Sequence, residues 1–203
     1  MKKDKNPIQT IENALKEKLF ANYEFNTTPT SFIEIDGYQI TNCYFNNIDF
    51  KNVTFHDVDF DNVTFESCDL SNKKFNSSFL KNVEFINCKM LGTSFIDATA
   101  NKLLIKSSAC KYINFSGAKI ENSDINDCDF SESSFLESKL KSVTLKEVRF
   151  TGAEFVKASL NEIDFSKCDI NGTIFDISSL KGIIVNSYQC PLLAPMLGIK
   201  VKD

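Results

Sequence analysis

The chain of 203 residues contains no tryptophan, a single histidine, seven glycines and four prolines. The glycines are scattered, so the sequence offers no glycine-rich loop for phosphate binding. It also has no run of 18 apolar residues, from which we expect no transmembrane helix. The charged residues 1–5 are followed by no apolar stretch, so we expect no secretory signal and a cytoplasmic protein.

Catalytic and metal-binding patterns are also missing. The seven cysteines are an odd number without a CxxC pair, which argues against a disulfide framework or a zinc site. A lone His56 without a fixed partner makes neither a catalytic triad nor a metal centre. We therefore expect no catalytic residue, no cofactor, no metal and no enzymatic activity. The net charge of −4 disfavours direct nucleic acid binding, because phosphates need clustered Lys and Arg.

What the sequence does have is a period of five. Every fifth position from 40 to 185 is apolar, 30 positions in succession, which neither a helical nor a simple strand period produces. Residues two positions before each centre are small or β-branched, which predicts a second inward set. Two positions after each centre, 19 of the 28 residues from 47 to 182 are Asn, Asp, Ser or Gly, which tolerate left-handed backbone. Each unit is therefore predicted to be a short extended piece followed by a corner.

A longer period of 20 gives the size of one coil. The unbroken series at that spacing is Phe55, Phe75, Phe95, Phe115, Phe135, Phe155 and Phe175. Like residues then stack on like, with four units in each coil. Coils spaced like neighbouring strands, about 4.8 Å apart, predict an all-β parallel solenoid roughly 36 Å long.

The same pattern assigns roles to unusual core residues. We expect the cysteines to be free, buried, small hydrophobes, with Cys68 stacked on Cys88. Lys73 is a charge at an inward position. The stretch 98–112 has small centres, Ala100 and Cys110, and is expected to be the weakest part of the repeat and to bulge.

Both ends of a solenoid need covers, since the last coils otherwise expose apolar surface. Residues 6–21 are predicted to form an amphipathic helix, with Asn6 as N-cap and Pro7 in its first turn, followed by a linker at 22–32. The period ends near Val185. We therefore divide the chain into a capping helix and linker (1–32), the solenoid (33–185) and a C-terminal segment (186–203).

The C-terminal segment is predicted to begin with a short helix capped by Ser187, shortened by Pro195 and stopped by Gly198. The apolar residues of this helix are Leu192, Leu193, Met196 and Leu197, and Ile199 and Val201 follow in an extended tail. The segment is more apolar than a cap requires, which favours self-association.

Over about residues 33–185 the repeat resembles the pentapeptide-repeat family, whose fold is a right-handed quadrilateral parallel β-helix. A second resemblance, to the C-terminal signature of the quinolone-resistance (Qnr) branch, concerns the tail. It is carried by Val185, Asn186, Ser187, Tyr188 and Gln189, by Leu192 and Leu193, and by Leu197, Gly198, Ile199, Lys200 and Val201.

The second resemblance implies a homodimer formed through the tail, with Leu192, Leu193, Leu197 and Ile199 in the contact. It also implies that the dimer mimics duplex DNA, binds DNA gyrase and topoisomerase IV, and protects them from quinolones or similar poisons. The chain departs from the branch in three respects. No loop interrupts the five-residue register, Pro191 and Pro195 lie in the tail helix, and the N-terminal helix is an addition.

Surface charge is uneven around the predicted coil. The two adjoining faces centred on the Phe45 and Phe50 series carry 11 acids and 7 bases, and the other two carry 9 acids and 8 bases. DNA mimicry needs negative charge that meets a basic groove. The candidate partner-binding acids are Asp49, Asp69, Glu84, Asp124, Asp127, Asp129, Glu147, Asp164 and Asp169.

The sequence leaves alternatives open. The acids also fit an ordinary solubilising surface, and the chain also fits an interaction scaffold with a different protein partner. Outward apolar residues such as Ile96, Leu136 and Val156 are consistent either with a protein contact or with caps that fold back.

Overall fold

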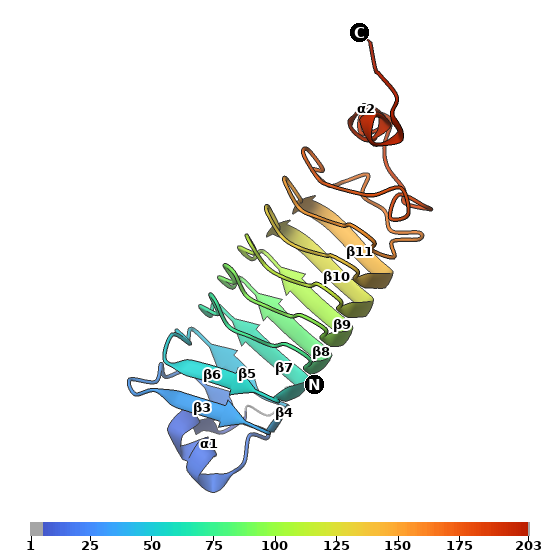
Figure 1. Ribbon diagram of the computed structural model, residues 1–203. Helices are drawn as coiled ribbons and strands as arrows, with labels where there is room; N and C mark the ends of the chain where they lie inside the picture. Colours follow the sequence, from blue (N-terminus) through green and yellow to red (C-terminus); the bar gives the residue numbers. More distant parts are fainter. Residues whose placement is uncertain (1–5, 203) are drawn as a thin grey trace, which may run out of the picture.

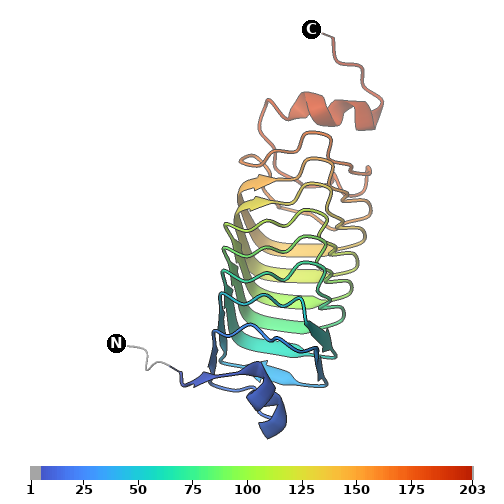
Figure 2. The ribbon, with the colours of Figure 1, turned by 90° about the vertical axis from the view of Figure 1, so that its left-hand side faces the viewer.

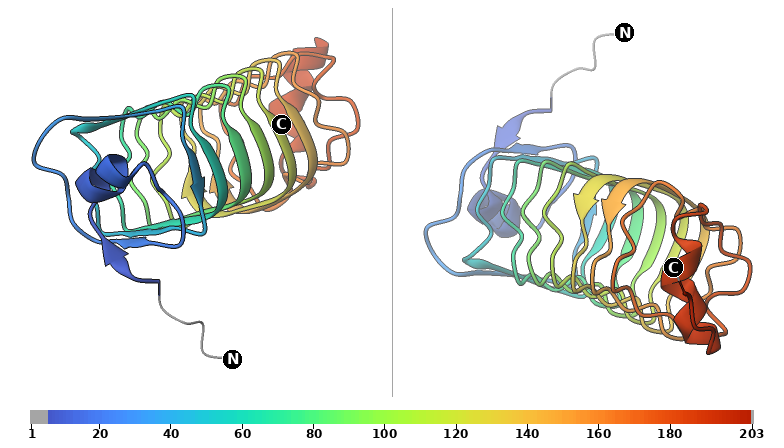
Figure 3. Two further views of the ribbon diagram at one scale, coloured as in Figure 1. Left: turned by 90° about the horizontal axis from the view of Figure 1, so that it is seen from below. Right: turned by 90° about the horizontal axis from the view of Figure 1, so that it is seen from above.

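The computed structural model describes residues 6–202, which form a rod of stacked coils with one terminus at each end (Figures 1 and 2). Seen along the rod, each coil is four-sided (Figure 3). The predicted parallel solenoid with four five-residue units per coil is confirmed. Residues 1–5, which contributed to the expectation of no secretory signal, lie outside the described residues. No helix in residues 6–202 is long and apolar enough to cross a membrane.

The strands are short, parallel and stacked along the rod. The N-terminal strands are β1 (Ile8–Gln9), β2 (Glu24–Phe25), β3 (Ile33–Asp36), β4 (Gln39–Thr41), β5 (Tyr44–Asn46) and β6 (Val53–His56). The longer strands are β7 (Asp59–Glu66), β8 (Phe79–Ile86), β9 (Thr99–Lys106), β10 (Lys119–Asp129) and β11 (Lys139–Arg149). One sheet has the order β1-β2-β5-β7-β8-β9-β10-β11 with β4 paired to β7, and β3 pairs with β6. Partners such as Phe65 and Phe85 differ by 20 residues, which is the predicted register.

The corners fall where the sequence predicted them. Asn47, Ser67 and Asn87 have φ near 55°, in the left-handed region, and nearly every equivalent position does the same. At one corner the asparagines also stack between coils. The Asn62 amide donates to Asn42 at 2.7 Å, and Asn42 donates to Asn22 at 3.0 Å. The corner residues thus turn the chain and tie successive coils together.

The core is the predicted pile of aromatic rings. From Phe55 to Phe175, successive rings of the 20-residue series lie 4.6–5.3 Å apart between centroids and are stacked. Rings of the neighbouring series meet them edge-to-face, as Phe85 meets Phe95 at 5.9 Å. All seven cysteines are free, and five of them are buried. Cys68 and Cys88 lie on neighbouring coils, since the N–H of Lys89 donates to the carbonyl of Cys68 at 2.9 Å, and each thiol donates to carbonyls of the backbone.

Two expectations about irregular positions have different outcomes. The predicted bulge at 98–112 is wrong, because β9 pairs in register with both β8 and β10. Ala100 and Cys110 are buried like the larger centres, so small residues are accommodated without a break in the ladder. Lys73 is the real irregularity. Its ammonium donates to the carbonyls of Val53 at 2.9 Å and Lys51 at 3.3 Å in the preceding coil.

The predicted helix at 6–21 is too long. Helix α1 spans only Ile11–Glu17, and its N-cap is Thr10, whose hydroxyl accepts from the N–H of Asn13 at 3.2 Å. Asn6 is not a cap, since its amide instead donates to the carbonyl of Asn42 at 2.8 Å. The pairing of β1 with β2 draws the preceding residues into the sheet.

The solenoid also starts earlier than predicted. The supposed linker contains β2, which pairs with β5, and the Phe25 ring stacks on Phe45 with a centroid distance of 4.7 Å. Phe20 is buried as well, at the place that the 20-residue spacing gives it below Ile40. Helix α1 lies across this end of the rod (Figure 3) and adds Ile11 and Ala14 to the core.

The C-terminal helix is shorter than predicted. Helix α2 spans Cys190–Leu193 and continues as the 3-10 turn η1 (Ala194–Leu197), which Gly198 ends with φ of 75°. The N-cap is Gln189 rather than Ser187. The Gln189 amide is buried and donates to the carbonyls of Phe165 at 2.9 Å and Cys168 at 2.8 Å. This side chain therefore covers backbone acceptors of the last complete coil.

Candidate functional site

The outward aspartates are held by local hydrogen bonds. Asp49, Asp69 and Asp129 each precede a core residue and accept the backbone N–H two residues later, at 2.8, 3.0 and 3.1 Å. Asp164 and Asp169 do the same at 2.8 and 3.1 Å. Such a carboxylate forms the turn at its own corner, so part of the acidic surface has a structural role.

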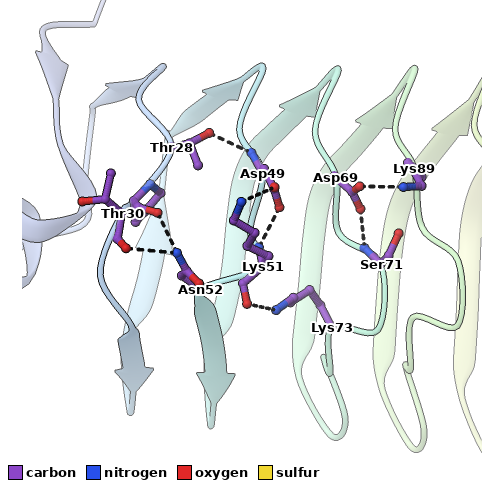
Figure 4. A network of polar contacts seen from close by, with 10 residues as sticks. Thr28, Thr30, Asp49, Lys51, Asn52, Asp69, Ser71, Lys73 and Lys89 are labelled. Atoms are coloured by element: carbon purple, nitrogen blue, oxygen red, sulfur yellow. Dashed lines mark hydrogen bonds and ion pairs between the residues drawn. The ribbon is translucent and has the colours of Figure 1, made fainter.

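Stacking then pairs two of these acids with bases from the next coil. The carboxylate of Asp69 lies 2.9 Å from the ammonium of Lys89, and Asp129 lies 3.1 Å from Arg149. Figure 4 shows the first of these pairs, next to Asp49 with Lys51 and to Lys73. Pairs at spacing 20 recur on other faces, and their charges cancel locally.

These contacts shift the acidity of the carboxyl groups. Partial burial opposes ionisation of Asp69, but hydrogen bonds from Ser71 and Lys89 outweigh it, so the pKa of Asp69 lies below its ordinary value. A hydrogen bond from Ser166 similarly lowers the pKa of Asp164. Both side chains are therefore ionised at neutral pH.

Ion pairing divides the nine candidate acids into two groups. Asp49, Asp69, Asp129 and Glu147 have a base within 4 Å. The acids without an ion pair among the described residues are Glu84, Asp124, Asp127, Asp164 and Asp169.

Four of the five unpaired acids lie on the Phe45 face, meaning the outward residues around the centres at 45, 65 and every twentieth position to 165. Glu84, Asp124 and Asp164 occupy a single column there, separated by two coils each, or about 10 Å. The negative surface is thus narrower than the sequence indicated. We call these three residues the acidic column.

The C-terminal end of the rod exposes apolar side chains. Among the predicted dimer residues, Leu192, Leu197 and Ile199 are exposed, whereas Leu193 packs against the core. Sequence reasoning did not assign Ile177 and Tyr188 to this apolar surface, although they are 70% and 89% exposed at the same end. Ile177 stands at a corner position where Asn, Asp, Ser or Gly is usual, and that signal was available in the sequence.

The other outward apolar residues do not form one continuous exposed stripe. Ile96 and Val156 are half-buried, and Leu136 is exposed. Phe79 is 60% exposed, far from the C-terminal end.

The histidine and the cysteines, which the sequence analysis considered as catalytic or metal-binding residues, lie in environments that do not activate them. His56 is outward, as predicted, with Nε2 3.4 Å from Glu34, and both side chains are solvated. Burial raises the pKa of the Cys43 thiol, and it raises that of Cys168 to about 11, so neither forms a thiolate readily. Within residues 6–202, no group of three or more His, Cys, Asp or Glu is arranged to hold a metal.

Models of known protein families match the repeat region of the chain. Residues 39–72 match a profile of pentapeptide repeats, and residues 58–129 and 118–189 match a pentapeptide repeat region. The chain belongs to the pentapeptide-repeat family. No curated protein sequence matches it significantly.

The solved structures that resemble this chain have low sequence identity to it. Full-length QnrB1, a plasmid-mediated fluoroquinolone resistance protein, is 21% identical over 88% of this chain and 89% of its own, with a TM-score of 0.45. HetL from the cyanobacterium Nostoc, a protein involved in heterocyst differentiation regulation, is 13% identical over 82% and 89%, with a TM-score of 0.40. A thylakoid lumen protein of Arabidopsis thaliana is 22% identical over 49% and 66%, with a TM-score of 0.32.

Proposed function

We propose that this pentapeptide-repeat protein is a non-enzymatic, cytoplasmic DNA mimic that binds DNA gyrase and topoisomerase IV and protects them from quinolones or similar poisons. In this proposal the rod takes the place of duplex DNA on the enzyme. The protein acts as a homodimer joined through its C-terminal ends, without a cofactor.

The acidic column is the observation that carries the proposal. Glu84, Asp124 and Asp164 have no ion-pair partner among the described residues, so their charge is available to a basic groove. Glu84 and Asp124 are set on one paired sheet about 10 Å apart, and Asp164 continues the column beyond β11, so an enzyme surface meets a line of charge. Unpaired charges of this kind mainly steer association and fix register.

The apolar C-terminal end supports the dimer. Leu197 and Ile199 are more than half exposed, and Tyr188 and Ile177 lie near the same end of the rod. Exposed apolar residues gathered at one place are typical of an interaction surface. A second copy joined there roughly doubles the length of the rod.

A supercoiling assay with purified gyrase and ciprofloxacin tests protection. The protein should restore supercoiling in a dose-dependent manner, and the double variant Glu84→Lys/Asp124→Lys should need about tenfold more protein. The matched control is Glu154→Lys, which reverses an exposed, unpaired carboxylate on another face. Absence of rescue at every protein concentration refutes the proposal.

Light scattering tests the dimer separately. Deletion of 187–203 is a poor test, because it removes Gln189 and its hydrogen bonds to the last coil. The exposed substitutions Leu197→Asp and Ile199→Asp keep that cap and should give a folded monomer. A dimer of unchanged mass would contradict the assignment of the interface to the tail.

A pull-down from cell lysate separates the proposal from its alternative. Recovery of gyrase or topoisomerase IV subunits, lost in the Glu84→Lys/Asp124→Lys variant, supports it. Recovery of another protein without them points to a scaffold with a different partner.

A further inference from the structure

A polar hollow lies on the surface of the rod between β11 and the coil that follows it. Its volume is about 500 Å³, within the range of small-molecule sites, which is about 300–1,000 Å³. β10 contributes Lys119, β11 contributes Lys139, Lys141 and Ser142, and the following coil contributes Ser159 and Asn161. We call it the lysine hollow.

Two of its lysines stand in one column without an acid. Lys119 and Lys139 are in register on neighbouring strands, so their side chains leave the sheet side by side. Thr99 precedes them in this column and Ser159 follows them, and neither carries a charge. Like charges directly opposite each other destabilise a sheet. An anion between the two ammonium groups relieves this repulsion.

Lysines elsewhere on the rod have acidic partners in the preceding coil. The ammonium of Lys81 lies 3.1 Å from the carboxylate of Asp61, and that of Lys157 lies 3.3 Å from Glu137. None of the three lysines of the hollow makes an ion pair within residues 6–202. Their ammonium groups are therefore available to a ligand.

Two glutamates also line the hollow, but they leave it positive. Glu121 is in register with Lys141 and offsets part of that charge, although the two do not form an ion pair among the described residues. Glu162 is the second acid. Three bases thus face two acids, and the excess charge is centred on Lys119 and Lys139.

The backbone adds a donor at the corner of β11. Corner N–H groups normally donate to the coil above, as that of Asn42 does to the carbonyl of Asp61 at 3.0 Å. Ser142 holds the same corner position, with φ of 52°, but its N–H has no backbone acceptor in the following coil, all of which the structure describes. Left-handed corners of this kind are recurring parts of anion-binding concavities.

The following coil supplies a second free N–H. The N–H of Thr41 donates to the carbonyl of Phe20 in the preceding coil at 2.9 Å. Asn161 holds the equivalent position, but within residues 6–202 its N–H makes no such bond to Leu140. Backbone N–H groups rarely stay without a partner in the protein, water or a ligand. The hollow therefore presents N–H donors from both sides in addition to its ammonium groups.

We propose that the lysine hollow binds the phosphate group of a small molecule. The donors come from three successive coils, and a tetrahedral phosphate presents oxygens in as many directions, whereas a carboxylate presents two in one plane. A phosphate monoester also carries a charge of about −2 at neutral pH, which suits two adjacent ammonium groups. The ligand lies in a surface hollow, so the contacts between coils stay as they are. The proposal does not depend on gyrase binding.

Titration of the full chain with inorganic pyrophosphate, followed by amide NMR, tests the site. At about 0.15 M salt, which screens exposed charges, the amide signals of Ser142 and Asn161 should shift and saturate with a dissociation constant below about 1 mM. The amide of Asn42, which is bonded to the next coil, should not move. Unmoved signals of Ser142 and Asn161 at about 10 mM pyrophosphate would overturn the proposal.

Substitutions test the role of the lysines. Lys119→Gln and Lys139→Gln should each weaken binding at least about tenfold, because each removes one charge-assisted hydrogen bond. Lys139→Arg keeps the charge and should retain binding. The matched control is Lys74→Gln, which removes an exposed, unpaired lysine at the same outward position of another face and should leave binding unchanged.

The remaining outcomes contradict the proposal in distinct ways. Equal weakening by Lys74→Gln indicates attraction of pyrophosphate to surface lysines in general. Binding of a short DNA duplex that depends on Lys139, without binding of pyrophosphate, assigns the hollow to nucleic acid. Circular dichroism confirms that each variant is folded.

Discussion

Phe95 lies in the middle of the aromatic column, and its replacement by alanine measures how far ring stacking holds the rod together. The ring is fully buried and stacks on Phe75 and Phe115, with centroid distances of 5.0 and 4.8 Å, while Phe85 meets it edge-to-face. Truncation of a buried Phe costs about 3–5 kcal/mol, and each aromatic contact adds about 0.5–1.5 kcal/mol beyond burial. We expect Phe95→Ala to lower the free energy of unfolding by about 5 kcal/mol.

The cost of Phe95→Ala, in the middle of the column, can be compared with the cost of the same substitution at the end of the column. Phe175 ends the same column and stacks on one ring only, Phe155 at 5.3 Å, so Phe175→Ala should cost about 3 kcal/mol. Phe79→Ala, at an exposed outward position, should cost less than about 0.5 kcal/mol.

Urea unfolding followed by circular dichroism measures all three variants. Each coil of a solenoid contacts only its neighbours, so the loss at Phe95 should also divide the rod and lower the slope of the transition or split it in two. A cost at Phe95 no greater than at Phe175 would refute the reasoning that two-sided stacking stabilises the middle of the rod.

Three further predictions concern the cap, a corner and the acidic surface. Gln189→Leu leaves the Cys168 carbonyl without a donor and removes one of the two donors to the Phe165 carbonyl, and it should cost about 1–3 kcal/mol in thermal or urea unfolding. Gly117→Ala should cost at least about 1 kcal/mol, since φ is +70° and the new Cβ would lie 2.2 Å from the Asp97 carboxylate. Burial opposes ionisation of Asp129, but hydrogen bonds from Ser131 outweigh it and lower its pKa below 3.8. Its stabilisation is therefore present above about pH 4 and lost as the pH falls through the folded pKa, so Asp129→Asn should lower the melting temperature at pH 7 and flatten its fall below pH 4.

The sequence alone predicted most of the fold because the pattern repeats. A residue such as Phe95 has the same environment in every coil, so period and stacking follow from spacing without knowledge of distant contacts. The corner residues also follow from local backbone preference. An ion pair such as that of Asp69 with Lys89 could also be inferred from the sequence, because residues 20 apart lie in neighbouring coils.

The tertiary structure decided what departs from the repeat. Residues 6–9 and 22–32 looked like helix and linker because their pairing partners lie in another coil, and pairing overrode local preference. The Gln189 cap depends on contacts more than 20 residues away. The five-residue pattern continues without a break from β11 into the next coil, although no backbone hydrogen bond joins 141–147 to 161–167 within residues 6–202. Side-chain spacing determines which residues face the core, and it does not determine whether two stacked segments of backbone come close enough to bond.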